Sequence, residues 1–495
     1  MSDIDHTGRG NWLDRTIEYF APGVALRREH SRVVLDMHRS YEAAKVGRRT
    51  AGWHAGSGSA NVEIGPSLVR VRNRCREMVR NNEYAAKTID ALVTNTVGTG
   101  FTASAPEQQV WDDWCVYCDA DGQLDFNGLT ELAQRTRRES GEVLIRFRQR
   151  LPEDGYAVPL QIQVLEPDHL DHSRNGPTNN GNFVIAGVEF NLIGQRVAYW
   201  LFPHHPGDVA SFRLNSLESK RVPASEILHY YRKRRPSQVR GMPELGVSLL
   251  RLRDLADYEQ AELVRKKIEA CFVAFVSTDN DQQALGTMRS TDGVEAGKQR
   301  QERVAPGMIK YLSNAESVDF GSPAASGGYG EYTTTQLLAV AAGAGVTYEQ
   351  LTGDGSRVNY SAGRSLLVEF RQAIAAEQWL AFAPMVLNPI AQRFQVTAKL
   401  AGAQRAAVKK FTWTAPRLPW VDPLKDAMAI KELARGGFQS ISEAIRERGD
   451  DPDKVFAEIK AEREKLRGLG IVVDSDAAVS ERLLSPEDVA KLLDK

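Results

Sequence analysis

The sequence predicts an α+β fold in which long helices accompany a β-rich domain. Residues 241–270 carry a helical pattern without a break after Gly246, and residues from Gly141 to His205 change to the two-residue period of strands. Polar, turn-rich residues 278–330 then separate two helical stretches. With 42% hydrophobic residues in a chain of 495, there is enough apolar material for a large globular core.

Charge and cysteine content narrow the class of protein further. The net charge is -1, from 63 basic and 64 acidic residues, which argues against tight nonspecific DNA binding but does not exclude passing contact with DNA. Four cysteines in so long a chain make no disulfide framework, and no basic-then-apolar leader opens the sequence, so we expect synthesis in the cytoplasm. No window reaches the roughly 18 apolar residues of a membrane span, so we expect no membrane insertion.

The first 240 residues divide into an arm and a larger domain. Residues 1–61 combine a basic run with a GSGSAN joint and are interpreted as a basic arm, with a solvated helical face as the alternative. Residues 62–240 begin with helical segments divided at Asn81 and Asn82 and continue into the β-rich part. The CxxC at Cys115 and Cys118 lacks a second pair of ligands, so core cysteines are the interpretation.

The central feature is the helix predicted from Gly241 to Ala270, within a segment 241–271. Pro243 suits a first helical turn, and about 28 residues at about 1.5 Å each give a helix on the order of 42 Å. A narrow apolar seam runs along it. The seam residues are Leu249, Leu252, Ala256 and Leu263. Such a seam favours packing against neighbouring helices.

After this helix the chain goes out and returns. Residues 272–330 are interpreted as a small projecting α/β subdomain with strands at MIKYL and SVDF, and 331–352 as a second helix. Residues 353–363 form a polar, glycine-rich loop with one cation, Arg357. Residues 364–423 form a long helix, kinked or divided by Pro384 and Pro389, and a return strand. Charged helices at 424–470 and a peripheral tail, 471–495, complete the chain.

Motifs for catalysis and cofactors are not found. GVEAGK at residues 293–298 is one residue short of a Walker loop and lacks its Ser or Thr, and neither GxSxG nor HExxH occurs. We therefore expect no enzyme activity, no catalytic residue, no metal and no cofactor. The alternative is a metal-dependent hydrolase acting on DNA. It would use the Asp168 to His172 cluster: Asp168, His169, Asp171 and His172. His204 and His205 form a second cluster.

Several blocks of sequence, in one order, closely resemble the lambda-type portal proteins of tailed bacteriophages. They include RVRNRCREMVRNNEYAAKTIDALVTNTVGTGF, SGEVLIRFRQR, LQIQVLEPDHLD, RVPASEILHYYRKRRPSQVRGMPELGVSLLRLRDL, GVTYEQLTGDGSRVNYSAGRS and APRLPWVDPLKDAMA. The resemblance covers about residues 12–470, and the blocks at 235–243 and 359–364 are the most specific. Gly355 and Ala362 depart from it, where the family more often has Tyr and Ser.

The resemblance implies a ring, typically of twelve subunits, at one capsid vertex of a virion, through which double-stranded DNA is packaged and ejected. It also implies partners: a terminase large subunit that supplies the ATPase, head-completion or adaptor proteins, and major capsid and scaffolding proteins, with a role in starting procapsid assembly. The implied parts are the wing (62–240), the first stem helix (241–271), the clip (272–330), the second stem helix (331–352), the tunnel loop (353–363), the long wing helix with its return strand (364–423) and the crown (424–470).

Two sets of site residues follow from these parts. In the tunnel loop, Ser356, Arg357, Asn359 and Tyr360 are expected to contact DNA. A solvent-facing turn arginine is the alternative for Arg357. In the stem, the four seam residues are expected to pack against other copies around the ring, a head-to-tail contact that closes by rotation.

Overall fold

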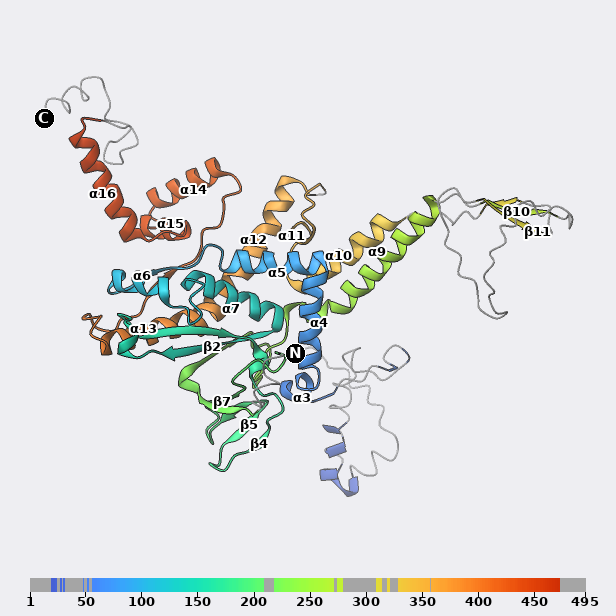
Figure 1. Cartoon of the computed structure of the whole chain (residues 1–495), viewed down its shortest axis with the longest axis horizontal. Helices are drawn as coiled ribbons and strands as arrows, with labels where there is room; N and C mark the ends of the chain where they lie inside the picture. Colours follow the sequence, from blue (N-terminus) through green and yellow to red (C-terminus); the bar gives the residue numbers. More distant parts are fainter. Residues whose placement is uncertain are drawn as a thin grey trace, which may run out of the picture. The chain divides into compact units, whose positions relative to one another are not determined.

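The computed structural model describes residues 56–208, 218–270, 274–278, 309–313, 318–320, 328–356 and 358–471, together with short stretches between residues 19 and 52. The chain divides into two units, Met1–Ser59 and Ala60–Lys495. In the first unit, residues 19–20, 22–24, 27–28 and 30–31 have helical backbone, and most of the predicted basic arm lies outside the described residues. The second unit holds the features described below (Figure 1).

The second unit begins with helices, and their buried residues form part of its hydrophobic cores. They are α3 (Ala60–Ile64), α4 (Leu68–Asn81), α5 (Glu83–Thr96), α6 (Gln108–Tyr117) and α7 (Phe126–Ser140). The predicted division at Asn81 and Asn82 is confirmed, because the Asn82 side chain accepts a hydrogen bond from Ala85 N at 3.0 Å and so caps α5.

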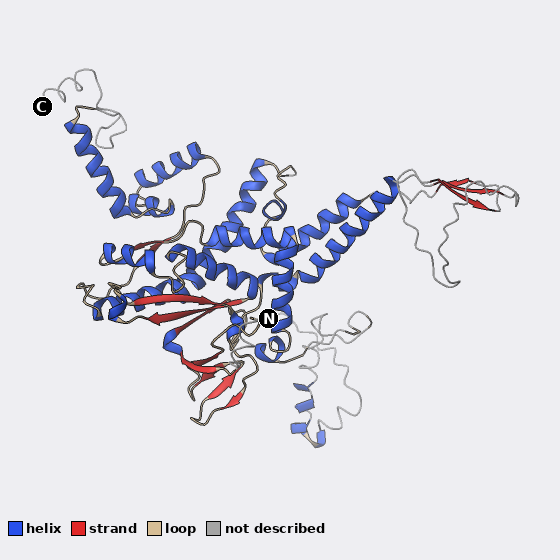
Figure 2. Cartoon of the chain, in the orientation of Figure 1, coloured by secondary structure: helices blue, strands red, loops and turns tan. Residues whose placement is uncertain are grey.

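Two antiparallel sheets follow, as the change of period predicted (Figure 2). The three-stranded sheet has the order β3 (Leu160–Leu165), β2 (Glu142–Gln149), β9 (Ile227–Tyr231). The five-stranded sheet runs in sequence order: β4 (Gly176–Pro177), β5 (Phe183–Ile185), β6 (Val188–Phe190), β7 (Arg196–Leu201) and β8 (Lys220–Pro223). Short 3-10 turns occur at η2 (Pro152–Asp154), η3 (Pro167–His169) and η4 (Ala224–Glu226). Alternate β2 residues Val143, Ile145 and Phe147 enter the main core.

An aromatic cluster joins the early helices to the C-terminal third of the chain. The Trp111 ring lies 5.1 Å from that of Trp114 and 5.0 Å from those of Phe394 and Phe411. β1 (Thr102–Ser104) pairs with β13 (Thr412–Thr414) beside it. Cys118 is buried in this core and Cys115 packs against it, as predicted.

The central helix exists but is shorter than predicted. α9 runs from Leu249 to Ala270, 22 residues rather than 28, and it is preceded by a 3-10 turn, η5 (Glu244–Val247). Pro243 has an extended backbone, with φ -55° and ψ 147°, so the predicted start at Gly241 is wrong. The physical reason is tertiary: Glu244 is held by ion pairs to Arg137 and Arg138 of α7.

The chain does go out along one helix and return along another. α9 leads to β10 (Ala274–Thr278), which pairs in parallel with β11 (Ile309–Ser313) and antiparallel with β12 (Val318–Phe320). The strands predicted at MIKYL and SVDF are thus confirmed, while most of 272–330 lies outside the described residues. α10 (Tyr329–Ala344) lies along α9, with the Tyr258 and Tyr332 rings 4.7 Å apart (Figure 1).

The remaining elements follow the prediction with two changes. α11 (Tyr348–Thr352) precedes the loop, and α12 (Tyr360–Glu377) begins inside the predicted 353–363 loop, because Asn359 caps it. Helix then continues through a π-helical segment, η6 (Gln378–Leu387), into α13 (Asn388–Leu400). The predicted break at Pro384 therefore takes the form of π-helical hydrogen bonding without an interruption.

Three capped helices end the described chain: α14 (Pro423–Arg435), α15 (Ile441–Glu447) and α16 (Pro452–Gly468). Asp422, Ser440 and Asp451 accept their N-terminal hydrogen bonds. Helices between 424 and 470 were predicted. Within the described ranges, none of the helices is both long and apolar enough to serve as a membrane span.

Candidate functional site

The base of the α9–α10 pair is packed inside its own chain. Leu249 and Leu252 are 7% and 0% exposed, and they join a core with Leu337 and Val340 of α10. The prediction that they contact other copies is therefore wrong for these two seam residues. Ala256 is half-buried, whereas Leu263 is 54% exposed.

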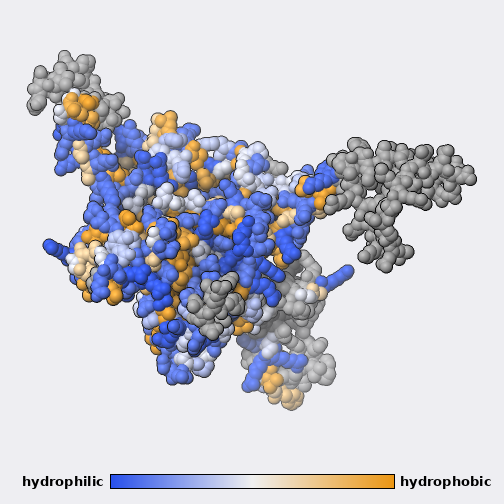
Figure 3. Space-filling view, viewed as in Figure 1, coloured by the Kyte–Doolittle hydropathy of each residue, from blue (hydrophilic) through white to orange (hydrophobic). Residues whose placement is uncertain are grey.

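The outer part of the pair carries uncovered apolar side chains. Leu263 and Val264 of α9 are 54% and 48% exposed, Tyr329 of α10 is 39% exposed, and apolar surface is visible toward the outer end of the pair (Figure 3). Leu338 of α10, which is 52% exposed, lies nearer the base, next to Leu337. Apolar side chains gathered on two adjacent helices favour contact with another surface. Of the predicted stem contacts, Leu263 fits this role.

The candidate tunnel loop is shorter than the predicted 353–363: it covers residues 353–359, because α12 begins at Tyr360. Ser356 N donates to Asp354 Oδ1 at 2.9 Å, and Asn359 Oδ1 accepts from Ala362 N at 2.8 Å. The Asn359 side chain is therefore used by the helix, whereas Tyr360 is 56% exposed. Arg357 lies outside the described residues. Ser356 and Tyr360 thus remain the described loop candidates for DNA contact.

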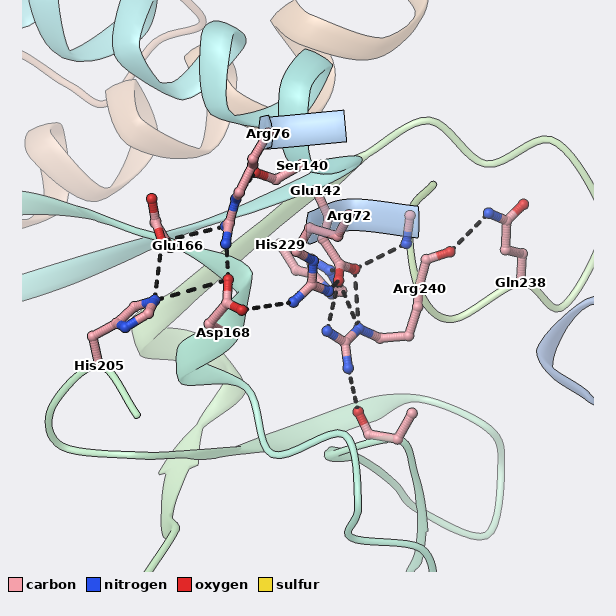
Figure 4. Close-up of polar contacts among 12 residues, drawn as sticks. Arg72, Arg76, Ser140, Glu142, Glu166, Asp168, His205, His229, Gln238 and Arg240 are labelled. Carbon is pink, nitrogen blue, oxygen red and sulfur yellow. Dashed lines mark hydrogen bonds and ion pairs between the residues drawn. The ribbon is translucent and has the colours of Figure 1, made fainter. Parts of the chain in front are cut away.

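A buried carboxylate, Glu142 of β2, anchors the segment that leads into α9 (Figure 4). Arg240 Nη2 donates to Glu142 Oε1 at 2.6 Å, and Arg72 of α4 donates to the same oxygen at 2.9 Å. Gly241 N donates to Glu142 Oε2 at 2.9 Å. Burial alone would raise the pKa of Glu142, but Arg240 and His229 hold that pKa well below its usual range.

His229 completes this Glu142 cluster in its neutral form. Arg196 Nη1 lies 3.0 Å from His229 Nδ1 and is always a donor, so Nδ1 accepts and Nε2 carries the proton that is donated to Glu142 at 2.9 Å. Burial lowers the pKa of His229 to about 4. The cluster therefore holds α4, β2, β9 and the segment that precedes α9 together.

Two glycines allow this close approach. Gly141 has φ +91°, and a Cβ on Gly241 would lie 2.1 Å from Gly141 O. Any side chain at Gly241 would push the 240–243 segment away from β2 and from Glu142. The sequence of the 235–243 block is thus constrained in two ways. Gly241 leaves no room for a side chain, and Arg240 must pair with the buried carboxylate of Glu142.

The acids and histidines considered for a metal site do not act as one group. Asp168 accepts from Arg76 at 2.7 Å, His169 Nδ1 lies 3.1 Å from Phe202 O, and Asp171 accepts from Ser173 and Ser219. His172 and His204 join none of these contacts among the described residues. Adjacent residues pointed to different partners, as expected for a short turn between strands.

The structure does bring Asp168 and His205, which belong to separate clusters in the sequence, close to Glu166, which the sequence did not indicate. His205 Nε2 lies 3.0 Å from Glu166, and Arg76 lies 3.3 Å from the same carboxylate (Figure 4). Arg72 and Arg76 already neutralise Asp168 and hold its pKa low against the effect of burial. A metal would have to displace an arginine here, so the arrangement is that of a structural ion-pair network.

A second buried cluster surrounds Glu244 and Glu377. Arg137 reaches Glu244 at 2.8 Å and Glu377 at 3.5 Å, while Tyr230 donates to Glu377 at 2.6 Å. Burial would raise the pKa of Glu244, but Arg137 and the arginines around it lower that pKa to about 2. Sequence reasoning missed this cluster, although paired arginines at 137–138 and the RKRR run at 232–235 were its signal.

Comparison with known proteins gives one family. The model of the phage portal protein, lambda family, matches residues 46–378. The probable portal protein of Halomonas phage phiHAP-1 is 26% identical, covering 88% of each chain. The portal protein of Escherichia phage N15 is 23% identical, covering 86% of this chain and 89% of its own, and portal protein B of Escherichia phage lambda is 20% identical, covering 88% and 91%.

Solved structures resemble the chain more loosely. The neck of an empty gene transfer agent (GTA) particle, computed with C6 symmetry, matches with TM-score 0.43 and 15% identity over 80% of this chain and 96% of its own. The neck of a native GTA particle, computed with C12 symmetry, matches with TM-score 0.42 and 15% identity over 77% and 91%.

Proposed function

The chain belongs to the lambda family of phage portal proteins, and we propose that its copies form a closed ring at one capsid vertex, through which double-stranded DNA is packaged and later ejected. The ring has twelve subunits and starts procapsid assembly. Its clip docks the terminase large subunit and later the head-completion or adaptor proteins. Its wing and crown face the major capsid and scaffolding proteins.

The observation that supports a ring is the α9–α10 pair with its exposed apolar residues. Leu263, Val264 and Leu338 are each about half exposed in the single chain. A copy related by rotation would cover them, because a head-to-tail contact between two different faces closes into a ring. In this proposal α9 and α10 are the stem, residues 62–240 the wing, 272–330 the clip, 353–359 with the first turn of α12 the tunnel loop, and 424–470 the crown.

In this proposal the chain guides DNA and does not drive it. The buried carboxylates Glu142, Glu244 and Glu377 are each held by arginines rather than arranged around a reacting group. A separate terminase would hydrolyse ATP. We therefore expect the isolated protein to show no ATP hydrolysis above a blank.

Imaging of the purified full-length protein tests the ring. Electron micrographs should show annular particles, and mass photometry should give a mass near that of twelve 54.9-kDa copies. Both measurements should be made at several salt concentrations, because charged contacts weaken as salt rises. A protein that stays monomeric at micromolar concentration in every salt condition contradicts the proposal, as would intrinsic ATP hydrolysis.

A further inference from the structure

A cavity of about 490 Å³ lies between α7, α12 and the end of α10. One wall is made of small or aliphatic side chains: Leu92, Ala342, Ala344, Ala373 and Ile374. The other wall is charged: Arg138, Arg232, Lys233, Arg234, Glu244 and Glu377. None of these residues was assigned a role in DNA passage.

The charged wall has more cations than anions. Arg137, directly behind it, pairs with both Glu244 and Glu377, so these two carboxylates face five cations in all. Glu244 is already shared by Arg137, Arg138 and Arg234, at 2.8, 3.2 and 3.0 Å. Glu244 and Glu377 are therefore already paired, and the charged wall keeps a net positive charge.

Two cations show this excess directly. The Arg138 side chain is 3% exposed, and its Nε has no hydrogen-bond acceptor among the described residues. Lys233 lines the cavity and forms no ion pair within the part of the chain that the structure describes. A buried donor without a partner is costly, and Lys233, although exposed in the single chain, adds a second positive charge beside Arg138, so the site is suited to an incoming anion.

We propose that a carboxylate side chain from a neighbouring copy of this chain enters the cavity and pairs with Lys233 and Arg138. This inference rests on the proposed ring. The mixed lining fits an aspartate or glutamate, whose methylene groups contact the alanines while its oxygens meet the cations. A phosphate of double-stranded DNA is the other anion that the proposed ring would bring near these cations.

The surroundings of the cavity favour a second copy as the source. Its walls come from α10 and α12, which also expose Leu338, Leu366 and Val368 at 52%, 41% and 59%. The helices that line the cavity thus also carry exposed apolar side chains of the kind that the ring would cover. The outward face of α9 supplies a matching anion, Asp254, which is exposed and has no ion pair among the described residues.

The test is Lys233→Glu in the full-length protein, with Lys220→Glu as the matched control. Both residues are exposed lysines in or next to a strand, but Lys220 lies on β8, away from the cavity. Lys233→Glu should raise the concentration at which half of the chains are in rings by about tenfold or more, since it replaces an attraction for the incoming carboxylate with a repulsion between like charges. Lys233→Ala should have a smaller effect in the same direction, and Lys220→Glu should stay within about twofold.

Measurements of folding and of assembly distinguish a failure of the cavity proposal from a failure of the proposed ring. Unchanged thermal unfolding of each variant shows that the chain still folds. If the wild-type protein forms no ring, the proposed function fails and this inference fails with it. If the wild-type protein forms rings and Lys233→Glu assembles equally well, only the cavity proposal fails.

A density map of the wild-type ring identifies the occupant. A neighbouring carboxylate within hydrogen-bond distance of Lys233 is the expected result. A cavity that holds only water, a segment of its own chain, or DNA in DNA-loaded rings would overturn the proposal. Normal assembly of Lys233→Glu combined with weaker DNA binding would instead assign the cavity to phosphate.

Discussion

At the scale of single residues, the 235–243 block, one of the two most specific in the sequence, has a structural role: it binds a buried carboxylate. Arg240 and Gly241 meet Glu142 across 98 and 99 residues of chain, and Gln238 donates to Arg240 O at 2.7 Å. The family resemblance drew attention to this block, but no local pattern in the sequence predicts that its partner is Glu142, so far away in the chain. Ion pairs of this kind are set by tertiary packing, which is also why Glu166 and His205 were not predicted to lie together.

The His229 imidazole should make stability depend on pH. Its pKa falls from 6.5 in the unfolded chain to about 4 in the folded protein. The folded state therefore binds fewer protons between these values, so the stabilisation is complete above about pH 6.5 and is lost as the pH falls toward 4. The loss amounts to about 3 kcal/mol.

Chemical denaturation at pH 7.5 and 4.5 measures this loss. His229→Gln keeps an amide donor near Glu142 but does not titrate, so it should be less stable than wild type at pH 7.5 and lose less stability on acidification. Equal pH dependence in the two proteins would show that another group is responsible.

At the scale of elements, the sequence predicted which helices and strands exist better than where they begin. The alternation of Val143, Ile145 and Phe147 was enough to predict β2. The start of α9 was misplaced because Pro243 and Glu244 fit a first helical turn, while the ion pairs of Glu244 hold that turn in 3-10 form. The start of α12 was misplaced because the cap formed by Asn359 was not recognised.

The two ends of α9 should respond differently to the same substitution. Leu252 is 0% exposed and packs within its own chain, so Leu252→Asp should lower the free energy of unfolding by about 3–5 kcal/mol. Leu263 is 54% exposed, so Leu263→Asp should change chain stability by less than about 0.5 kcal/mol while it weakens ring assembly.

Denaturation and mass photometry on both variants separate the two roles. A stable, fully assembled Leu263→Asp protein would remove that residue from the interface between copies. A stable Leu252→Asp chain would mean that the base of α9 is less tightly packed than its burial indicates.

At the scale of the whole molecule, the order of parts was predictable and their contacts were not. A long helix, a projection and a returning helix followed from the periodicity alone. The aromatic core was not predictable, because Trp111 meets Phe394 and Phe411 nearly 300 residues later in the chain. The function could be inferred only from the family blocks, since a fold of helices and sheets does not by itself identify an activity.

In the proposed ring a charge in the tunnel loop is repeated in every copy, so we expect substitution of Arg357 to be a sensitive test of DNA passage. Arg357→Glu replaces one positive charge with one negative charge in every copy, so a twelve-subunit ring would present a ring of anions to the phosphate backbone. We expect normal rings and a fall of about tenfold or more in DNA packaging. Lys409→Glu, the same change at an exposed position after α13, is the control.

Packaging is measured as DNA protected from nuclease in capsids assembled with each variant and supplied with terminase and ATP. A defect for Arg357→Glu that shrinks as salt rises would identify repulsion of the phosphates as its cause, because screening weakens charge interactions across an aqueous channel. Loss of the rings themselves would assign Arg357 to contacts between copies. Full packaging by the Glu variant at low salt would mean that the loop does not touch DNA during its passage, and that Tyr360 or another group lines the narrowest part of the channel.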